Sequence, residues 1–193
     1  MVDVHFRMSH TSDITTIYTE PASLRSLYSL RNLQGVTHVE AFREVPVKLQ
    51  FEHRFYRTSV MGIQPDGVLM RLLDANLRRI DVPQEGVILT DYLAELLHIK
   101  TGDMLTIEVL EGNRPVVQVP VVGMAREYLG VNAYMQREYL NRLLKEGDAI
   151  SGAWLNVDQQ YQKNIYAELK NMPRIAGVVE QKSAIKAFYE TLA

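Results

Sequence analysis

Apolar and polar residues alternate in several stretches of the chain, and this pattern predicts half-buried β-strands. The alternation is clearest at Val47, Leu49 and Phe51, which are interleaved with polar residues. Successive side chains of a strand point to opposite faces, so one face of such a strand is buried and the other is solvated. On the same grounds we predict strands over residues 2–8, 36–49, 55–63, 105–109, 115–124, 153–157 and 175–179.

Apolar residues spaced three or four positions apart predict helices between these strands. One helix begins near Pro21 and ends before Gly35, and another contains Ile165 and Leu169 and ends before Pro173. Proline is tolerated in the first turn of a helix but not in its interior, and glycine often ends a helix, so these residues mark the boundaries. The same spacing predicts helices over residues 68–73, 91–98 and 134–145.

The two ends of the chain contain similar strand-helix-strand segments. The first helix ends in residues 30–33 (LRNL) and the second in residues 169–172 (LKNM), and a β-branched residue opens a strand shortly after each. Two such segments on one sheet form the split βαβ arrangement of ferredoxin-like domains. The alternative is that the two segments look alike only because helix-to-strand junctions often do.

These patterns predict an α+β fold in which one domain interrupts another. Residues 1–64 and 153–182 are predicted to form the split βαβ, ferredoxin-like domain. Residues 65–152 are predicted to form an inserted mixed α/β subdomain with its own apolar core, and residues 183–193 a C-terminal helix.

The composition is that of a folded domain with a mixed surface charge. The chain has 21 Lys and Arg, 23 Asp and Glu, 47% hydrophobic residues and a net charge of -2. It lacks the basic excess of a nucleic-acid-binding protein, so we expect no nucleic-acid partner. The longest stretch without a charged residue, 115–125, is too short for a membrane-spanning helix, which needs about 20 apolar residues.

No motif in the sequence carries a recognisable catalytic chemistry. The absence of Cys excludes disulfides, thiolate metal sites and a cysteine nucleophile. Phosphate-binding glycine loops are absent and the five His are scattered, so we expect no catalytic residue, metal or cofactor. Residues 100–102 (KTG) and 183–186 (SAIK) match two β-lactamase motifs, but in reversed order along the chain. His38 and Glu40 could bind a metal weakly, although a solvated strand face explains them better.

One loop is a candidate contact surface. Between a predicted strand and a predicted helix, the chain is rich in aromatic and aliphatic residues, and exposed apolar groups of this kind often mark interfaces. The alternative is that the loop folds back onto the inserted core. The candidate partner or cargo contacts are Tyr128, Leu129, Val131, Tyr134 and Met135.

The order of three segments resembles the extracytoplasmic core domain of FtsX-like, MacB-type ABC transporter permeases. Residues 86–107 (GVILTDYLAELLHIKTGDMLTI) resemble that family's signature of a Val-Ile-Leu run, a Leu-Ala helix, Gly-Asp and a strand. Residues 119–124 (VPVVGM) resemble its valine-rich strand, and residues 34–40 (QGVTHVE) its early helix-to-strand junction. The similarity extends over nearly the whole chain in the same order.

This resemblance implies a function without catalysis. It implies a porter-type βαβ domain interrupted by a sabre-like insertion, with residues 183–193 leading toward a membrane segment that is absent from this chain. The implied partners are the transmembrane part of the same permease, a cytoplasmic ABC ATPase subunit, a second permease copy, and a periplasmic adaptor or lipoprotein. The implied role is export or release of a lipid, lipoprotein, peptide or toxic compound at the extracytoplasmic face of the bacterial membrane.

Two other functions remain open from the sequence. The first is a free-standing periplasmic binding or adaptor module, which would recognise a partner by strand addition or through the apolar loop. The second is a small α/β enzyme whose catalytic residues lie far apart in the sequence. Apolar runs of about 20 residues flanking the domain in the gene would favour the permease.

Overall fold

The computed structural model describes residues 2–128 and 130–192, which divide into two compact units. One unit contains residues 1–10 and 43–147, and the other contains residues 11–42 and 148–193. We refer to them as the barrel unit and the open-sheet unit. The domain boundaries predicted from the sequence, 64/65 and 152/153, therefore differ from those in the structure. Residues 43–64 belong to the barrel unit, and residues 148–152 belong to the open-sheet unit.

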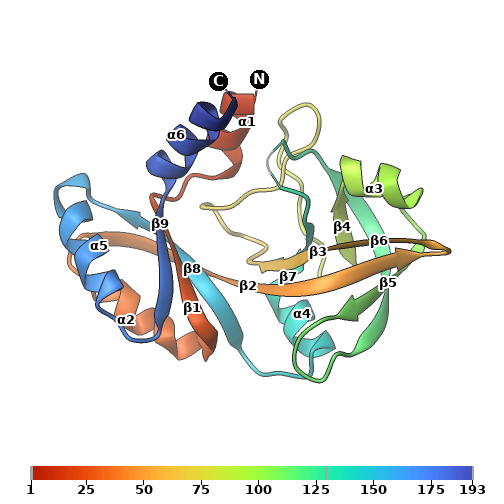
Figure 1. Ribbon diagram of the computed structural model, residues 1–193, viewed down its shortest axis with the longest axis horizontal. Helices are drawn as coiled ribbons and strands as arrows, with labels where there is room; N and C mark the ends of the chain where they lie inside the picture. Colours follow the sequence, from red (N-terminus) through yellow and green to blue (C-terminus); the bar gives the residue numbers. More distant parts are fainter. Residues whose placement is uncertain (1, 129, 193) are drawn as a thin grey trace. The chain divides into compact units, whose positions relative to one another are not determined.

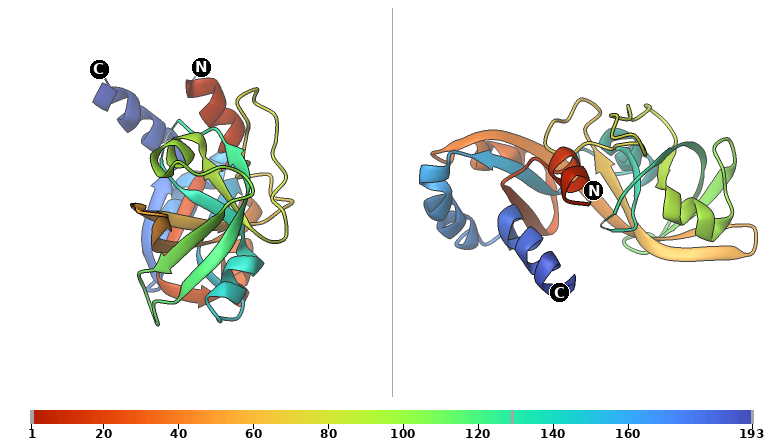
Figure 2. Two further views of the ribbon diagram at one scale, coloured as in Figure 1. Left: turned by 90° about the vertical axis from the view of Figure 1, so that its right-hand side faces the viewer. Right: turned by 90° about the horizontal axis from the view of Figure 1, so that it is seen from above.

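The barrel unit is a closed ring of six strands, shown on the right of Figure 1 and in two further views in Figure 2. The order is β3-β7-β4-β6-β5-β2, and β2 pairs with β3 to close the ring. β3–β7 and β4–β6 are parallel pairs, and the other pairs are antiparallel. The strands are β2 (Val36–Phe51), β3 (Arg54–Ile63), β4 (Val87–Thr90), β5 (Met104–Val109), β6 (Val116–Ala125) and β7 (Ala133–Gln136).

Side chains fill the interior of the ring. Alternate residues of β2 (Val45, Val47 and Leu49) are fully buried, as the alternation in the sequence predicts. They belong to one apolar cluster with residues of the other five strands and of the helices α3 (Asp91–Leu97) and α4 (Arg137–Leu143). Thr90 caps α3 by accepting a hydrogen bond from the Leu93 N–H, which positions the helix beside β4.

Two predicted elements of the barrel unit are wrong. Residues 2–9 form a helix, α1 (Val2–Ser9), and not a strand. Its buried side chains are the polar His5 and Ser9, four residues apart, whereas Val4 and Met8 are 50% and 40% exposed. The alternation of apolar and polar residues over only seven positions therefore predicted the two-residue period of a strand where the chain forms a helix. Residues 68–73 form no helix, and two isolated bridges, His10 with Met70 and Leu73 with Arg79, order this region.

The open-sheet unit contains four antiparallel strands in the order β2-β8-β1-β9. They are the first part of β2, β8 (Ala149–Val157), β1 (Ile14–Ser23) and β9 (Ile175–Glu180). β8 thus lies between β1 and β2, and β1 lies between β8 and β9. Three of the four strands expected in this sheet are present, but the fourth is β1 and not residues 2–8.

Two helices cover one face of this sheet (Figure 1). They are α2 (Leu27–Arg31), which follows the 3-10 turn η1 (Leu24–Ser26), and α5 (Gln162–Lys170), which follows η2 (Gln159–Tyr161). Leu27 and Leu30 of α2 and Ile165 and Leu169 of α5 pack in one cluster with the strands. Both helices therefore lie on the same face, as expected.

The C-terminal helix and the surface charges complete the description. The helix expected over 183–193 is α6 (Gln181–Leu192), which follows β9 directly.

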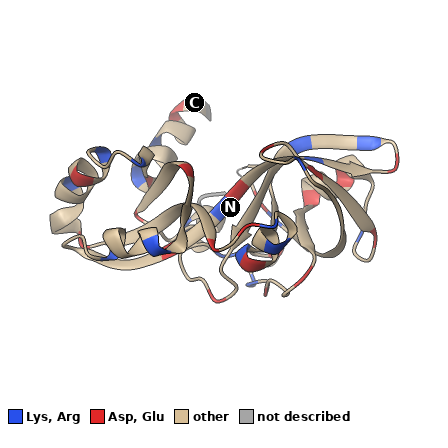
Figure 3. Ribbon diagram, turned by 90° about the horizontal axis from the view of Figure 1, so that it is seen from below, with Lys and Arg blue, Asp and Glu red and all other residues tan. Residues whose placement is uncertain are grey.

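Among residues 2–128 and 130–192, no helix combines the length and apolar character needed to cross a membrane. Acidic and basic residues occur on both units (Figure 3), in keeping with the small net charge.

Candidate functional site

The candidate contact residues of the barrel unit have very different exposures. Tyr128 is 37% exposed and Val131 is partly buried. Tyr134 and Met135 are 1% and 0% exposed, so the expectation that they form part of an exposed surface is wrong. They belong to β7, which pairs with β3 on one side and β4 on the other and directs both side chains into packed surroundings. Leu129 lies outside the described residues.

The loop around Tyr128 is fixed by polar and aromatic contacts. The Tyr134 hydroxyl donates to Glu127 Oε2 at 2.5 Å, and burial raises the pKa of Glu127 to about 7. The Tyr128 ring meets the His5 ring edge-on, with centroids 5.0 Å apart. Arg126 Nε lies 3.1 Å from Asp91 Oδ2 at the start of the loop. These contacts hold the loop in place but assemble no nucleophile and base.

The other sequence candidates do not form a reactive centre. His38 Nε2 lies 3.0 Å from Glu40 Oε1, so this pair interacts internally on β2. Residues 100–102 form the turn before β5, and Ser183 lies in α6. No group of three or more potential metal-ligating side chains (His, Cys, Asp or Glu) occurs among the residues that the structure describes.

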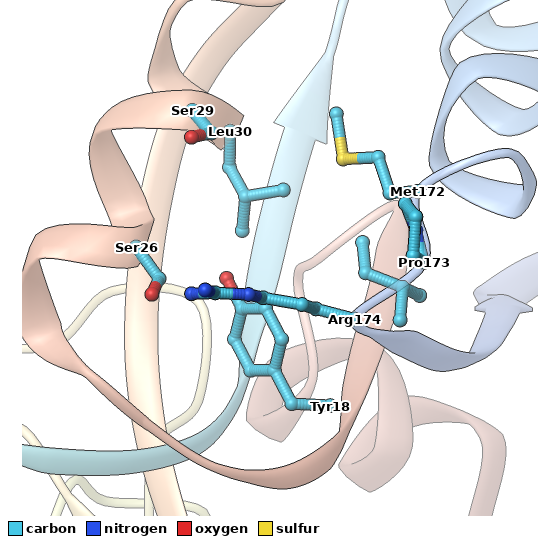
Figure 4. Close-up of a pocket in the computed structure, with 8 residues that line it drawn as sticks. Tyr18, Ser26, Ser29, Leu30, Met172, Pro173 and Arg174 are labelled. Carbon is cyan, nitrogen blue, oxygen red and sulfur yellow. The ribbon is translucent and has the colours of Figure 1, made fainter.

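A cavity that the sequence does not predict lies in the open-sheet unit (Figure 4). Its volume is about 400 Å³. Three segments form it: β1, the helical turn of η1 and α2, and the connection between α5 and β9. Its lining residues are Tyr18, Ser26, Ser29, Leu30, Met172, Pro173, Arg174 and Ile175.

The polar side of this cavity contains hydrogen-bond donors. Tyr18 is 8% exposed, and its hydroxyl has no hydrogen-bond partner among the described residues. Burial raises the pKa of Tyr18, and the nearby positive charge of Arg174 opposes part of that rise. Figure 4 shows the Arg174 side chain extending across the cavity toward Ser26, with the Tyr18 ring beside it.

The backbone fixes the position of Arg174. The Thr19 N–H donates to the Arg174 carbonyl at 2.9 Å, which ties the residue to β1 next to Tyr18. Arg174 itself is exposed and forms no ion pair with any acidic side chain that the structure describes. The guanidinium therefore has donors available to a ligand.

The opposite side of the cavity is apolar. Leu30, Met172 and Ile175 line it, and Leu30 is 1% exposed. An apolar wall with a few donors at one end is typical of small-molecule sites. The lining residues of the cavity include no carboxylate and no histidine, and the arrangement of an apolar wall beside hydrogen-bond donors supports the binding of a ligand.

Comparisons with known proteins identify the fold. No model of a protein family matches the sequence, and no curated protein matches it. The periplasmic region of MacB from Actinobacillus actinomycetemcomitans superposes with a TM-score of 0.60 over 95% of this chain and 95% of that one, at 12% identity. The extracellular domain of the noncanonical ABC-type transporter YknZ from Gram-positive bacteria superposes with a TM-score of 0.53 over 80% of this chain and 87% of that one, at 13% identity. The chain therefore has the sheet-dominated α/β fold of these extracytoplasmic transporter domains.

Proposed function

We propose that this chain is the non-catalytic extracytoplasmic domain of an ABC transporter permease of the FtsX-like, MacB type. The observation that carries the proposal is the superposition on the MacB periplasmic region, which covers 95% of both chains and so includes both units. The resemblance of residues 86–107, 119–124 and 34–40 to the family's segments supports it independently.

In this proposal the two units correspond to the two parts of the family's domain. The open-sheet unit is the porter-type unit with a split βαβ, ferredoxin-like arrangement, since each of its strand-helix-strand segments encloses a strand of the other. The barrel unit is the sabre-like insertion. The helices α1 and α6, at the two ends of the described chain, lead toward membrane segments of the same permease.

The domain acts by binding and by movement. A separate cytoplasmic ABC ATPase subunit hydrolyses ATP, and the domain couples the resulting motion to export or release of a lipid, lipoprotein, peptide or toxic compound. Tyr128 and Val131, the exposed and half-exposed members of the predicted contact loop, are proposed to contact a second permease copy, a periplasmic adaptor or the cargo.

Single-cysteine labelling of the complete gene product tests the location. The described chain has no native Cys, so an introduced thiol gives a clean signal. Tyr28 and Leu30 lie in the same helix but are 64% and 1% exposed. In spheroplasts, Tyr28→Cys should react fully with a membrane-impermeant maleimide, whereas Leu30→Cys should react only after denaturation.

The alternatives give different results in the same experiment. Reaction of Tyr28→Cys only after lysis would place the domain in the cytoplasm and overturn the proposal. Reaction in a protein that leaves the membrane with the soluble periplasmic fraction would identify a free-standing adaptor instead. The wild-type protein, carried through the same steps, measures any labelling from cysteines elsewhere in the gene product.

A further inference from the structure

We propose that the cavity of the open-sheet unit binds a small amphipathic anion, namely a single medium-length hydrocarbon chain that ends in a carboxylate. This proposal goes beyond the transporter role and does not depend on it. It rests on the distribution of donors and apolar groups around the 400 Å³ cavity.

The polar end selects an anion. All the side-chain polar groups of the lining can donate hydrogen bonds, and none is acidic: they are the hydroxyls of Tyr18, Ser26 and Ser29 and the guanidinium of Arg174. The Arg174 guanidinium presents a planar fork of N–H groups that matches a carboxylate. A cationic ligand would meet an unpaired positive charge and is disfavoured.

The buried hydroxyl of Tyr18 is an independent indication of a ligand. A buried polar group without a hydrogen-bond partner is unfavourable, and native proteins have few of them. Tyr18 is 92% buried, since 8% of it is exposed, and its hydroxyl lacks a partner in the described structure. A carboxylate held by Arg174 would supply the missing acceptor.

The apolar end and the volume limit the rest of the ligand. Leu30, Met172 and Ile175 offer a wall that favours aliphatic groups over polar ones. A cavity of 400 Å³ is near the lower limit of small-molecule sites. It suits one chain of about ten carbons.

The binding experiment uses decanoate at concentrations below its micelle threshold. Calorimetry on the 193-residue chain should show saturable binding to one site. Decanol, which lacks the charge, and acetate, which lacks the chain, should each bind at least tenfold more weakly. In a ¹³C-methyl spectrum, the signal assigned to Met172 by its loss in Met172→Leu should shift on titration.

Three variants connect binding to the proposed residues. Arg174→Gln should weaken decanoate binding at least tenfold, whereas Arg31→Gln, which removes another exposed arginine of the same unit, should leave it unchanged. Tyr18→Phe should weaken binding severalfold without lowering the thermal midpoint, because the hydroxyl contributes no hydrogen bond to the fold.

Several results would overturn the proposal. These are the absence of saturable binding by the wild-type chain, equal binding by Arg174→Gln and Arg31→Gln, or decanol binding as tightly as decanoate. Shifts at other methionines with none at Met172 would place the ligand elsewhere and would also refute it. A purely cytoplasmic location in the labelling experiment would overturn the transporter role alone.

Discussion

At the scale of single residues, Gly152 shows how closely the strands of the open-sheet unit approach. It lies in β8 opposite Ile17 of β1 and Phe42 of β2. A Cβ at this position would lie 2.1 Å from the Thr16 carbonyl oxygen and 2.7 Å from the Phe42 ring. The carbonyl belongs to the backbone of a paired strand and cannot move aside without disturbing that pairing.

We therefore predict that Gly152→Ala lowers the free energy of unfolding by about 2–4 kcal/mol through overpacking. Gly147→Ala is the matched control, because a Cβ there would have no atom within 4 Å, and it should change stability by less than about 0.5 kcal/mol. Urea denaturation followed by circular dichroism measures both. Equal stabilities of the two variants would contradict the close approach.

Glu127 gives the barrel unit a pH-dependent stability. Its pKa is raised by burial to about 7, so between its ordinary value and about 7 the folded chain binds a proton that the unfolded chain has released. Stability from this group is therefore fully present below the ordinary value and is lost as the pH rises to about 7, by up to about 1.4 kcal/mol per pH unit. His10, whose pKa burial lowers to about 4, has the opposite effect between pH 4 and 6.5.

A difference measurement separates Glu127 from the histidines. Glu127→Gln keeps the shape of the side chain but cannot ionise, and its stability relative to the wild type should increase steadily from pH 4.5 to about 7 and then level off. His5 and His10 are present in both proteins, so their contributions cancel. Glu20→Gln, which removes an exposed carboxylate, should show no such increase; a flat difference for both variants would refute the role of Glu127.

At the scale of elements, β2 contains a buried arginine, Arg43, that pairs with two partly exposed carboxylates. Arg43 is 3% exposed, and its guanidinium contacts Glu146 Oε1 at 2.8 Å and Glu111 Oε1 at 2.5 Å. It also donates to the Glu44 carbonyl at 2.8 Å. One side chain of β2 thus joins the β5–β6 hairpin loop to the segment that follows α4.

Replacing Arg43 should destabilise the chain more than replacing an exposed arginine. Arg43→Ala is expected to lower the free energy of unfolding by about 1–3 kcal/mol, because it removes the packing and the hydrogen bonds of a buried side chain. Arg114→Ala removes a 60% exposed partner of Glu108 at 3.6 Å and should cost less than about 1 kcal/mol. Denaturation at low and high salt checks this, since only the exposed pair should weaken as salt rises.

The regularity of the apolar and polar pattern in a strand determined whether the sequence could predict it. The alternation in β2, β5 and β6 extends over enough residues to fix strand type and buried face. β1 was missed because its buried residues include Thr16, whose hydroxyl donates to the Ala153 carbonyl at 3.1 Å. That partner lies far away in the sequence, so no local pattern marks Thr16 as a buried residue, and the sequence predicts no strand in this segment.

At the scale of the whole molecule, the features that define the site come from distant parts of the chain. Tyr18 and Arg174 line one cavity because β1 and β9 pair. No pattern of neighbouring residues in the sequence predicts that pairing. The closure of the barrel depends in the same way on β7, a four-residue strand that pairs with β3 and β4. The resemblance of residues 86–107 to a transporter family indicated the fold without knowledge of the β1–β9 pairing or of the pairing of β7.

The contact between Arg43 and Glu146 also has a consequence for the order of folding. The open-sheet unit must join β1 and β2 to β8 and β9, which follow about a hundred residues later in the chain. Closing a loop of that length in an unfolded chain carries a large entropic penalty. If the barrel forms first, its ion pair brings residues 43 and 146 together. The loop between β2 and β8 is then already closed, so pairing these two strands carries a much smaller entropic penalty.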